Sequence, residues 1–581
     1  MTKWEISYKP KTKNNSPKPE ELVQILLKNR GVNTKRKQRE FLAPDLKKIT
    51  IASVGINKVN LLKAIKRIQK AIENQEQIVV FGDYDVDGIC GSAILWETLN
   101  GIGAKVLPYI PNRIEEGYGL SVKGIENLKS QLPTTKLIIT VDNGIVATKA
   151  VDFAKTLGID VIITDHHVPA KKLPKAYSIV HTTQLCGAGV AYMLSQEIFS
   201  TAEVTSENFL AAHAKQLKPI NKIKPANSRD KNFDSSPQFN HLELVALATV
   251  SDLVPLKNAN RILLKFGLEK LRQTKRIGLI ALFTEAVLNQ KDIGVYEIGH
   301  IIAPRLNAMG RLNSAMDSLR LICTTDRKRA EELALKLGST NKERRGITEN
   351  ATLHAREFVK SQKKLGNLLF ISHKSYQQGV IGLIAGRLAE EFYLPTIIVS
   401  EGEVYSKASA RSIAGFNIIE FIRSASDILV DVGGHPMAAG FTVETKKIAQ
   451  LKKRLELEAL RLISEDLKNR SLKIDCELNF SAISQEVFDK LQTLAPFGAG
   501  NSQPVFVAKG VKVESARLVG NDKHLKLKLS HSGKIFDAIF FGAGDKKINV
   551  GDEIDVVYLL DENIWNGNKT LQLKIRDIGE N

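Results

Sequence analysis

Three aspartates at alternate positions follow an apolar run near residue 80. The segment VVFGDYDVDG (residues 79–88) delivers Asp83, Asp85 and Asp87 and then a glycine. In an extended chain, side chains two residues apart point the same way, so these carboxylates repel one another unless a cation lies among them. The segment therefore indicates a metal site. The alternative is a strand-to-helix turn in which the aspartates cap the helix.

Polar side chains also follow two further apolar runs. Asp142 follows KLIITV, and Asp165, His166 and His167 follow IDVIIT. Asp142 could equally be a turn residue with an unusual backbone conformation, and the two histidines could be satisfied core residues. These alternatives would have to apply independently at three strand ends. One metal site shared by the three strand ends explains all of these residues at once and is therefore favoured.

A fourth acidic residue, Asp252, interrupts the apolar helix VALATVSDLVPL, where it needs a partner or caps the next turn. Together the carboxylates and imidazole form a mixed oxygen and nitrogen set, which suits Mn²⁺ better than an all-oxygen Mg²⁺ or Ca²⁺ cage. Two such ions could clamp a phosphodiester and activate a water for in-line attack. The sequence therefore predicts phosphoester hydrolysis, and the predicted metal ligands are Asp83, Asp85, Asp87, Asp142, His166 and Asp252.

Alternating strand and helix patterns must position these side chains. NKVNLLKAIKRIQKAIENQ has helical spacing, IVVFGDYD is strand-like, and GICGSAILWETLN, KVLPYI, KLIITV, VATKAVDFAKTLG and IDVIIT continue the alternation. Such alternation predicts a doubly wound α/β domain with a parallel sheet, whose ligand site lies beyond the carboxyl ends of the strands.

The rest of the chain divides by the same criteria. A polar segment at about residues 200–240 is predicted to be a surface insertion, and residues 326–363 form a charged connector helix. A second, smaller α/β pattern runs from NLLFISHK to GGHPMAAGFTV, and short C-terminal strands predict a small closed barrel. In HLKLKLS, lysines alternate with leucines, which fits either a strand-binding groove or a lysine-coated edge strand.

Charge and cysteine content indicate the kind of partner and exclude some kinds of site. The 581 residues carry a formal net charge of +20, which favours a polyanionic partner such as nucleic acid. The four cysteines lie far apart with no C-x-x-C pair, so neither a disulfide framework nor a zinc knuckle is indicated. No apolar leader or membrane-length stretch is present in the sequence, so we expect a cytoplasmic protein.

The motifs carry a resemblance to a known family. GDYDVDG, VDNG and TDHH resemble the DHH phosphoesterase superfamily, and APRLNAMGRLNSA, KASARS, GGHPMAAG and APFGAGNSQPVF resemble its RecJ family of single-stranded-DNA exonucleases. LLKNRGVNTKRKQREFLAP is similar to that family's N-terminal segment. The resemblance implies an N-terminal segment (1–57), a DHH catalytic domain (58–325), the connector helix (326–363), a DHHA1 domain (364–445), a linking helix (446–470) and an OB-like domain (471–581).

The resemblance also assigns roles to single residues. His167 would act beside the metals, Asp165 would hold a histidine tautomer, and His435 would lie where the DHHA1 domain closes over the site. Nucleic-acid contacts would come from Arg113, Arg305, Asn307, Arg311, Ser409 and Arg411, with Arg113, Ser409 and Arg411 on a terminal 5′-phosphate.

This sequence departs from its relatives at two positions. Phe81 replaces a metal-binding histidine of pyrophosphatase-like relatives, so a second ion would need Asp83 or substrate oxygens. Gln377 stands where many members have a histidine, while His373 lies further upstream.

The predicted function is a Mn²⁺-dependent or Mg²⁺-dependent exonuclease that degrades single-stranded DNA from the 5′ end to nucleoside monophosphates in repair and recombination. A DHH phosphodiesterase of short oligonucleotides or cyclic dinucleotides is the enzymatic alternative, and an inactive strand-binding scaffold is the other. The expected partners are single-stranded DNA, a single-strand-binding protein and a helicase, with the chain itself a monomer and no membrane contact.

Overall fold

The computed structural model describes residues 3–9, 17–113, 115–213, 241–565 and 567–580. The chain forms two compact units. The first comprises residues 1–38, 342–495 and 503–581, and the second comprises residues 39–341 and 496–502. The polar segment predicted at about 200–240 begins inside a helix, α7 (Gly187–His213), and residues 214–240 of it lie outside the described residues.

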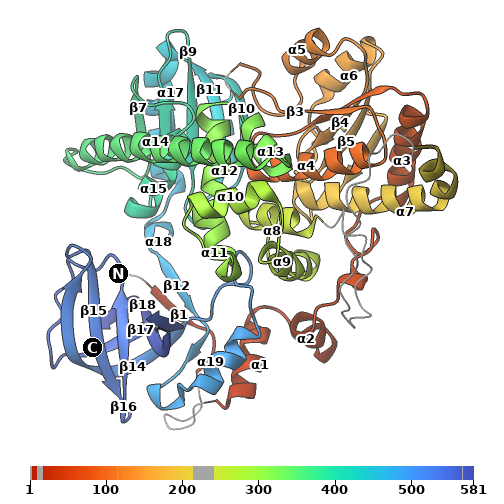
Figure 1. Cartoon of the computed structure of the whole chain (residues 1–581). Coiled ribbons are helices and arrows are strands. Elements are labelled where there is room, and N and C mark those ends of the chain that lie inside the picture. The colour runs from red at the N-terminus through yellow and green to blue at the C-terminus, as the bar shows by residue number, and fades with distance from the viewer. Residues whose placement is uncertain (1–2, 10–16, 114, 214–240, 566, 581) are drawn as a thin grey trace. The chain divides into compact units, whose positions relative to one another are not determined.

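The second unit is built on a five-stranded parallel sheet in the order β3-β2-β4-β5-β6. The strands are β2 (Gln77–Phe81), β3 (Val106–Tyr109), β4 (Thr135–Val141), β5 (Asp160–Asp165) and β6 (Ser178–His181). One face packs on α3 (Lys58–Glu73), α4 (Val86–Gly101) and α7, and the other on α5 (Val122–Gln131) and α6 (Thr148–Thr156) (Figure 1). This confirms the predicted doubly wound α/β fold.

Helices complete this unit after α7. They are α8 (Leu242–Ser251), α9 (Asn258–Leu271), α10 (Ile277–Glu285), α11 (Val295–Glu297), a π-helical turn (Ile298–Ile302), α12 (Ala303–Leu312) and α13 (Met316–Cys323). The connector prediction is confirmed as the 34-residue helix α14 (Arg327–Lys360), which contributes residues to both units.

In the first unit, a mixed five-stranded sheet follows α14 in the order β10-β11-β9-β8-β7. Its strands are β7 (Leu369–His373), β8 (Thr396–Ser400), β9 (Tyr405–Arg411), β10 (Leu429–His435) and β11 (Ala438–Glu444). α14 and α15 (Ile381–Phe392) cover one face, while α16 (Ile418–Arg423) and α17 (Ile448–Leu462) cover the other. The predicted second α/β pattern is therefore confirmed.

The C-terminal strands form a closed barrel. They are β14 (Phe506–Val519), β15 (His524–His531), β16 (Lys534–Phe540), β17 (Glu553–Trp565) and β18 (Asn568–Glu580), and the β14–β17 pairing closes the ring. Leu525, Leu527 and Leu529 are buried, as their alternation predicts. β15 pairs with β14 on one side and β16 on the other, so the reading of HLKLKLS as an edge strand is wrong.

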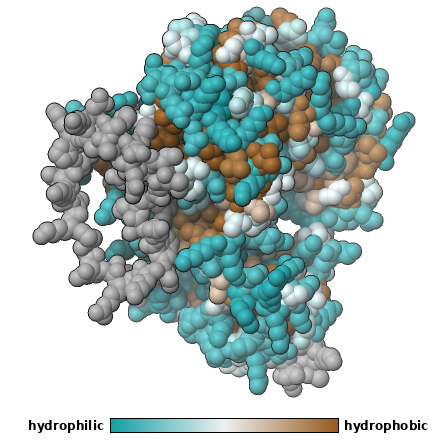
Figure 2. Space-filling view, turned by 90° about the vertical axis from the view of Figure 1, so that its right-hand side faces the viewer, coloured by the Kyte–Doolittle hydropathy of each residue, from teal (hydrophilic) through white to brown (hydrophobic). Residues whose placement is uncertain are grey.

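The N-terminal segment is divided between the units. β1 (Lys3–Ile6) pairs in parallel with β12 (Ser471–Ile474), and α1 (Pro19–Asn29) packs on α19 (Gln485–Gln492). α2 (Lys35–Leu42) leads into the second unit. No helix within the described ranges is long and apolar enough to cross a membrane, and hydrophilic residues cover most of the face in Figure 2.

Candidate metal centre

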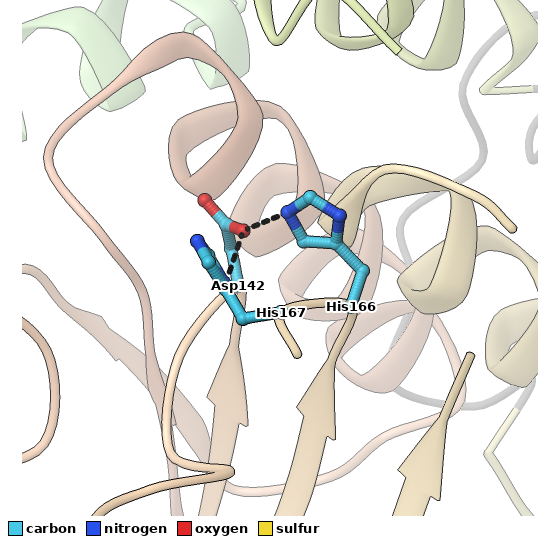
Figure 3. A group of neighbouring side chains, drawn as sticks. All are labelled: Asp142, His166 and His167. Atoms are coloured by element: carbon cyan, nitrogen blue, oxygen red, sulfur yellow. Dashed lines mark ion pairs between the residues drawn. The ribbon is translucent and has the colours of Figure 1, made fainter. Parts of the chain in front are cut away.

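The predicted ligands gather at the carboxyl ends of three neighbouring strands, β2, β4 and β5. Figure 3 shows the Asp142 carboxylate directed toward the His166 ring, with His167 beside it. Three overlapping groups have ligand atoms within 4.8 Å of one another: Asp142 with His166 and His167, Asp87 with His166 and Asp252, and Asp83 with Asp85 and Asp142. Asp142 and His166 each belong to two groups, so the groups form one continuous centre.

The turn after β2 serves two purposes. Asp85 is the N-cap of α4, and its Oδ1 accepts hydrogen bonds from the backbone N–H groups of Asp87 (3.0 Å) and Gly88 (3.1 Å). Asp85 therefore caps the helix, as the alternative interpretation of this motif predicted. It also belongs to one of the three candidate ligand groups, so the two roles are compatible. A Cβ on Gly88 would lie 2.6 Å from the backbone of Asp83. Only glycine therefore allows the first turn of α4 to pack this closely against the backbone of Asp83.

Asp87 is held by a distant segment. The backbone N–H groups of Gly187 and Ala188, in the first turn of α7, donate to its two carboxylate oxygens at 2.6 and 2.7 Å. A Cβ on Gly187 would also lie 2.6 Å from the Cβ of Asp142. The sequence analysis did not predict this role of CGAG (residues 186–189). The start of a helix at this segment is the feature that could have indicated it.

Asp142 and Asp165 occupy special positions at strand ends. Asp142 has φ = +63°, the left-handed conformation that aspartate tolerates, so it is a turn residue, as the alternative interpretation predicted. This conformation is compatible with the predicted metal role. Asp165 accepts hydrogen bonds from the backbone N–H groups of Ile145, His166 and His167 and contacts His167 Nδ1 at 2.8 Å. This contact is the one expected of a residue that fixes a histidine tautomer.

Asp252 lies at the C-cap of α8, and its Oδ2 is 3.6 Å from His166 Nε2. A carboxylate at the negative end of a helix dipole is unfavourable without a nearby positive charge. His166 Nε2 also faces Asp142 Oδ1 at 3.1 Å and Asp87 Oδ2 at 3.7 Å. Three carboxylates thus surround one imidazole nitrogen.

These residues fit a divalent cation. Among the residues that the structure describes, Asp83 Oδ1, Asp142 Oδ1 and His166 Nε2 are buried side-chain atoms without a hydrogen-bond partner. Buried polar atoms are ordinarily satisfied, so these three atoms, of which Asp142 Oδ1 and His166 Nε2 lie 3.1 Å apart, are suited to coordinating a cation. Carboxylates with a neutral imidazole form a donor set for Mn²⁺, and for Mg²⁺ where oxygens dominate.

The electrostatics agree with that fit. Burial, and then repulsion from neighbouring aspartates, raises the pKa values of Asp83, Asp85, Asp142 and Asp252, that of Asp252 to about 8. Burial lowers the pKa of His166, which favours the neutral ligand form. For His167, burial is outweighed by the hydrogen bond to Asp165, and the pKa rises to about 9.

Asp252→Asn should stabilise the metal-free protein in a pH-dependent way. Because the pKa of Asp252 is higher in the folded than in the unfolded state, its stabilising protonated form is complete below about pH 4 and lost as the pH rises toward 8. The Tm difference between variant and wild type in EDTA should therefore grow over this range, to on the order of 5 °C. The exposed residue Asp152 on α6 provides the control, Asp152→Asn. A Tm difference independent of pH would contradict the assignment.

The segment after β3 brings Arg113 and Tyr118 to the centre. The Arg113 guanidinium lies 5.0 Å from the Tyr84 ring centroid, and the Tyr118 hydroxyl lies 3.3 Å from His167 Nε2. Sequence reasoning named Arg113 but missed Tyr118, five residues later in the same motif. Phe81 is fully buried against the Tyr109 ring and provides no ligand.

The predicted strand contacts on α12 have structural partners in this unit. Asn307 Oδ1 accepts the backbone N–H of Val86 at 2.9 Å, which ties α12 to the aspartate turn. Arg305 pairs with Glu285 (2.6 Å) and donates to the Ile301 carbonyl. Arg311 is half-buried in the last turn of the helix. The nucleic-acid roles of these three residues stay predictions.

The remaining predicted residues belong to the sheet of the first unit. Arg411 donates to Ser409 Oγ at 3.2 Å, and both face the first turn of α15, where a Cβ on Gly382 would lie 3.0 Å from each side chain. His435 is exposed at the end of β10.

Residues 496–502 pack against the loop that follows Asp252, and we call them the 496–502 strap. The Leu256 N–H donates to the Ala499 carbonyl at 2.7 Å. Gly500 has φ = +70°, and a Cβ there would lie 2.9 Å from the Pro255 Cβ. The strap therefore fixes the loop between α8 and α9, which begins at Asp252.

Gly500→Ala should weaken Mn²⁺ binding by roughly tenfold, because the displaced loop carries Asp252, and supports of metal ligands have effects of this size. Gly533→Ala is the matched control, since Gly533 has φ = +75° and no atom within 4 Å of an added Cβ. Both variants bear the same backbone strain, so isothermal titration with Mn²⁺ should separate them. Equal Mn²⁺ affinities would show that the strap does not position the ligand.

Comparison with known proteins gives consistent results. Residues 77–218 match the model of the DHH family, N-terminal domain, residues 365–459 match the DHHA1 domain, and residues 474–577 match the RecJ OB domain. The single-stranded-DNA-specific exonuclease RecJ of Bacillus subtilis is 33% identical over 573 residues, which cover 96% of this chain and 67% of that protein. RecJ of Salmonella typhimurium is 31% identical, with 89% of each chain covered.

Solved structures extend the likeness. The crystal structure of RecJ in complex with Mn²⁺ from Thermus thermophilus has a TM-score of 0.79 at 27% identity, covering 100% of this chain and 80% of that one. The Mg²⁺ complex has a TM-score of 0.72 at 26% identity, covering 100% and 78%. With its DHH, DHHA1 and OB regions in order and its acidic centre at the DHH strand ends, the chain belongs to the RecJ family of single-stranded-DNA-specific exonucleases.

Proposed function

We infer that this chain is a metal-dependent exonuclease that hydrolyses single-stranded DNA. One observation carries the inference: three overlapping ligand groups, linked through Asp142 and His166, lie at the strand ends of the DHH sheet. We propose that two divalent ions, Mn²⁺ or Mg²⁺, occupy these groups, with Asp83, Asp85, Asp87, Asp142, His166 and Asp252 as ligands. Ions bound there would supply an activated water and neutralise charge on the scissile phosphate.

The chain's own residues supply the rest of the chemistry. The Gly187 and Ala188 N–H groups fix the Asp87 carboxylate, and Asp165 orients the His167 ring. Hydrogen bonding to Asp165 keeps a proton on His167 near neutral pH, so this imidazole can donate to a phosphate oxygen. The Tyr118 hydroxyl, 3.3 Å from His167 Nε2, adds a second contact to the ring.

We propose that Ser409 and Arg411 bind the terminal 5′-phosphate and set the direction of digestion from the 5′ end. A hydroxyl and a guanidinium converge there, and the absence of a side chain at Gly382 keeps the space beside them open. Arg is suited to phosphate recognition because its planar group donates several hydrogen bonds at once. Arg113, Arg305, Asn307, Arg311 and His435 remain proposed strand contacts.

The barrel is proposed to hold the strand away from the active site. On its outer surface, Arg517 of β14 pairs in register with Lys526 of β15, with Lys528 two residues further along. Since β15 is an inner strand, these lysines are not explained as protection of a sheet edge. A basic row on an OB barrel is suited to a phosphate backbone.

The alternatives fit less well. A phosphodiesterase of dinucleotides has no use for the closed barrel at residues 506–580. An inactive scaffold would not require a complete set of buried, mutually repelling carboxylates. A single-strand-binding protein and a helicase as partners, a monomeric state and the domain bounds predicted from the sequence also remain proposals.

Digestion of end-labelled single strands tests the function. With Mn²⁺ present, strands labelled at the 5′ end should release labelled mononucleotide from the start, while strands labelled at the 3′ end should shorten progressively. Duplex DNA, and single strands in EDTA, serve as negative controls and should not be digested. Release of label from the 3′ end first, or turnover restricted to dinucleotides, would overturn the proposal.

A further inference from the structure

Two exposed histidines pack against each other in the first unit, at the carboxyl end of β7, with their ring planes tilted by 49°. His373 is the last residue of β7, and His354 comes from α14. Their ring centroids are 4.6 Å apart, and both rings contact the ring of Tyr376, at 5.4 and 5.7 Å. We call His354 and His373 the histidine pair. Neither residue belongs to the proposed metal centre or to the Ser409–Arg411 site.

Hydrogen bonds determine the tautomer of His373. The backbone N–H of Ser375 donates to His373 Nδ1 at 3.1 Å, and the Ser375 hydroxyl lies 2.7 Å from the same atom. An N–H group can only donate, so Nδ1 carries a lone pair and the ring proton is on Nε2. His373 therefore presents a neutral N–H donor.

Tyr376 imposes the same state on His354. The Tyr376 side chain is 1% exposed, and burial raises the pKa of its hydroxyl to about 12, so the hydroxyl keeps its proton. That hydroxyl lies 2.8 Å from His354 Nδ1, which is its only hydrogen-bond partner among the described residues. A buried hydroxyl proton needs an acceptor, so the hydroxyl donates to Nδ1. The proton of His354 is therefore also on Nε2.

The pair thus offers two Nε2–H donors at an exposed surface. Within the described part of the chain, neither Nε2 atom makes a hydrogen bond. A protonated Nε2 cannot ligate a metal, so the arrangement selects a hydrogen-bond acceptor. The exposed Lys374 follows directly and adds positive charge, which favours an anionic acceptor. The carboxyl end of the parallel β7–β8 pair is also where α/β sheets commonly bind ligands.

We propose that the histidine pair binds a phosphate group of a single-stranded nucleic acid through its two Nε2–H donors. The proposal rests on the proposed function for the identity of the polyanion. The histidine pair would recognise phosphate through hydrogen bonds from neutral imidazole N–H groups, whereas Arg411 would recognise it through a charged guanidinium. The phosphate can be an internal phosphodiester or a terminal monophosphate.

The test compares strand binding in EDTA, by fluorescence anisotropy, for wild type and three variants. The double variant His354→Phe, His373→Phe keeps two aromatic rings but has no donor, and should bind a labelled oligothymidylate about tenfold more weakly than wild type. His373→Gln retains a neutral N–H donor and should keep near wild-type affinity. Because neutral donors release no counterions, the double variant should keep the wild-type slope of log affinity against log salt, whereas Lys374→Ala should flatten it by roughly 0.7.

Each outcome is informative. A loss of affinity that is equal for 5′-phosphate and 5′-hydroxyl strands identifies an internal phosphodiester, and a loss confined to 5′-phosphate strands identifies a terminal phosphate. Unchanged affinity of the double variant overturns the proposal, as does a flattened salt slope or a His373→Gln variant as weak as the double variant. If wild type itself does not bind single strands, the proposed function fails instead.

Discussion

Asp142→Asn should slow strand cleavage by roughly a thousandfold while leaving strand binding close to wild type. Asp142 belongs to two of the three ligand groups, so its loss should disturb both proposed ions. Metal ions contribute several kcal/mol to stabilising charge in such reactions, and each 1.36 kcal/mol is tenfold in rate, so kcat should fall by roughly a thousandfold. Release of acid-soluble nucleotide from labelled single strands under Mn²⁺ measures the rate.

The same substitution should raise the Tm of the metal-free protein. Burial and the charges of Asp87, Asp85 and Asp83 raise the pKa of Asp142, which means that its ionised form destabilises the fold. In Mn²⁺ the order should reverse, because wild type gains binding free energy that the variant lacks. Asp152→Asn, on the exposed face of α6, should change neither rate nor Tm. An Asp142→Asn protein with wild-type turnover would refute the ligand set.

The positions of these aspartates followed from local sequence. Apolar runs of strand length that end in Asp83, Asp142 and Asp165 meet at one sheet edge because parallel strands share their carboxyl ends. The alternation of apolar and polar residues also predicted the buried leucines of β15. Helical spacing predicted α3, α4, α6 and α14. These features depend on neighbours a few residues apart, which periodicity detects.

The supports of the site depend on contacts that no local pattern records. Asp87 is bound by backbone groups 100 residues later in the chain, and Asn307 caps a turn 221 residues earlier. The 496–502 strap meets Leu256 through backbone groups, for which side-chain type gives no signal. The β1–β12 pairing likewise joins the two halves of the sequence. Such partners are set by the tertiary fold, so sequence reasoning named the proposed ligands and missed the groups that hold them.

Gly382→Val should remove the preference for a 5′-phosphate. An added side chain at Gly382 begins 3.0 Å from both Arg411 Nη2 and Ser409 Oγ, so these groups must move away from the first turn of α15. Loss of a charge-assisted contact of this kind should lower the ratio of cleavage rates on 5′-phosphate and 5′-hydroxyl strands by about tenfold. Gly386→Val lies one turn further along the same helix, where an added Cβ meets nothing within 4 Å, and carries the same change in helix propensity. A rate ratio that falls equally in both variants would trace the effect to α15 itself, and a ratio unchanged in Gly382→Val would place the terminal phosphate elsewhere.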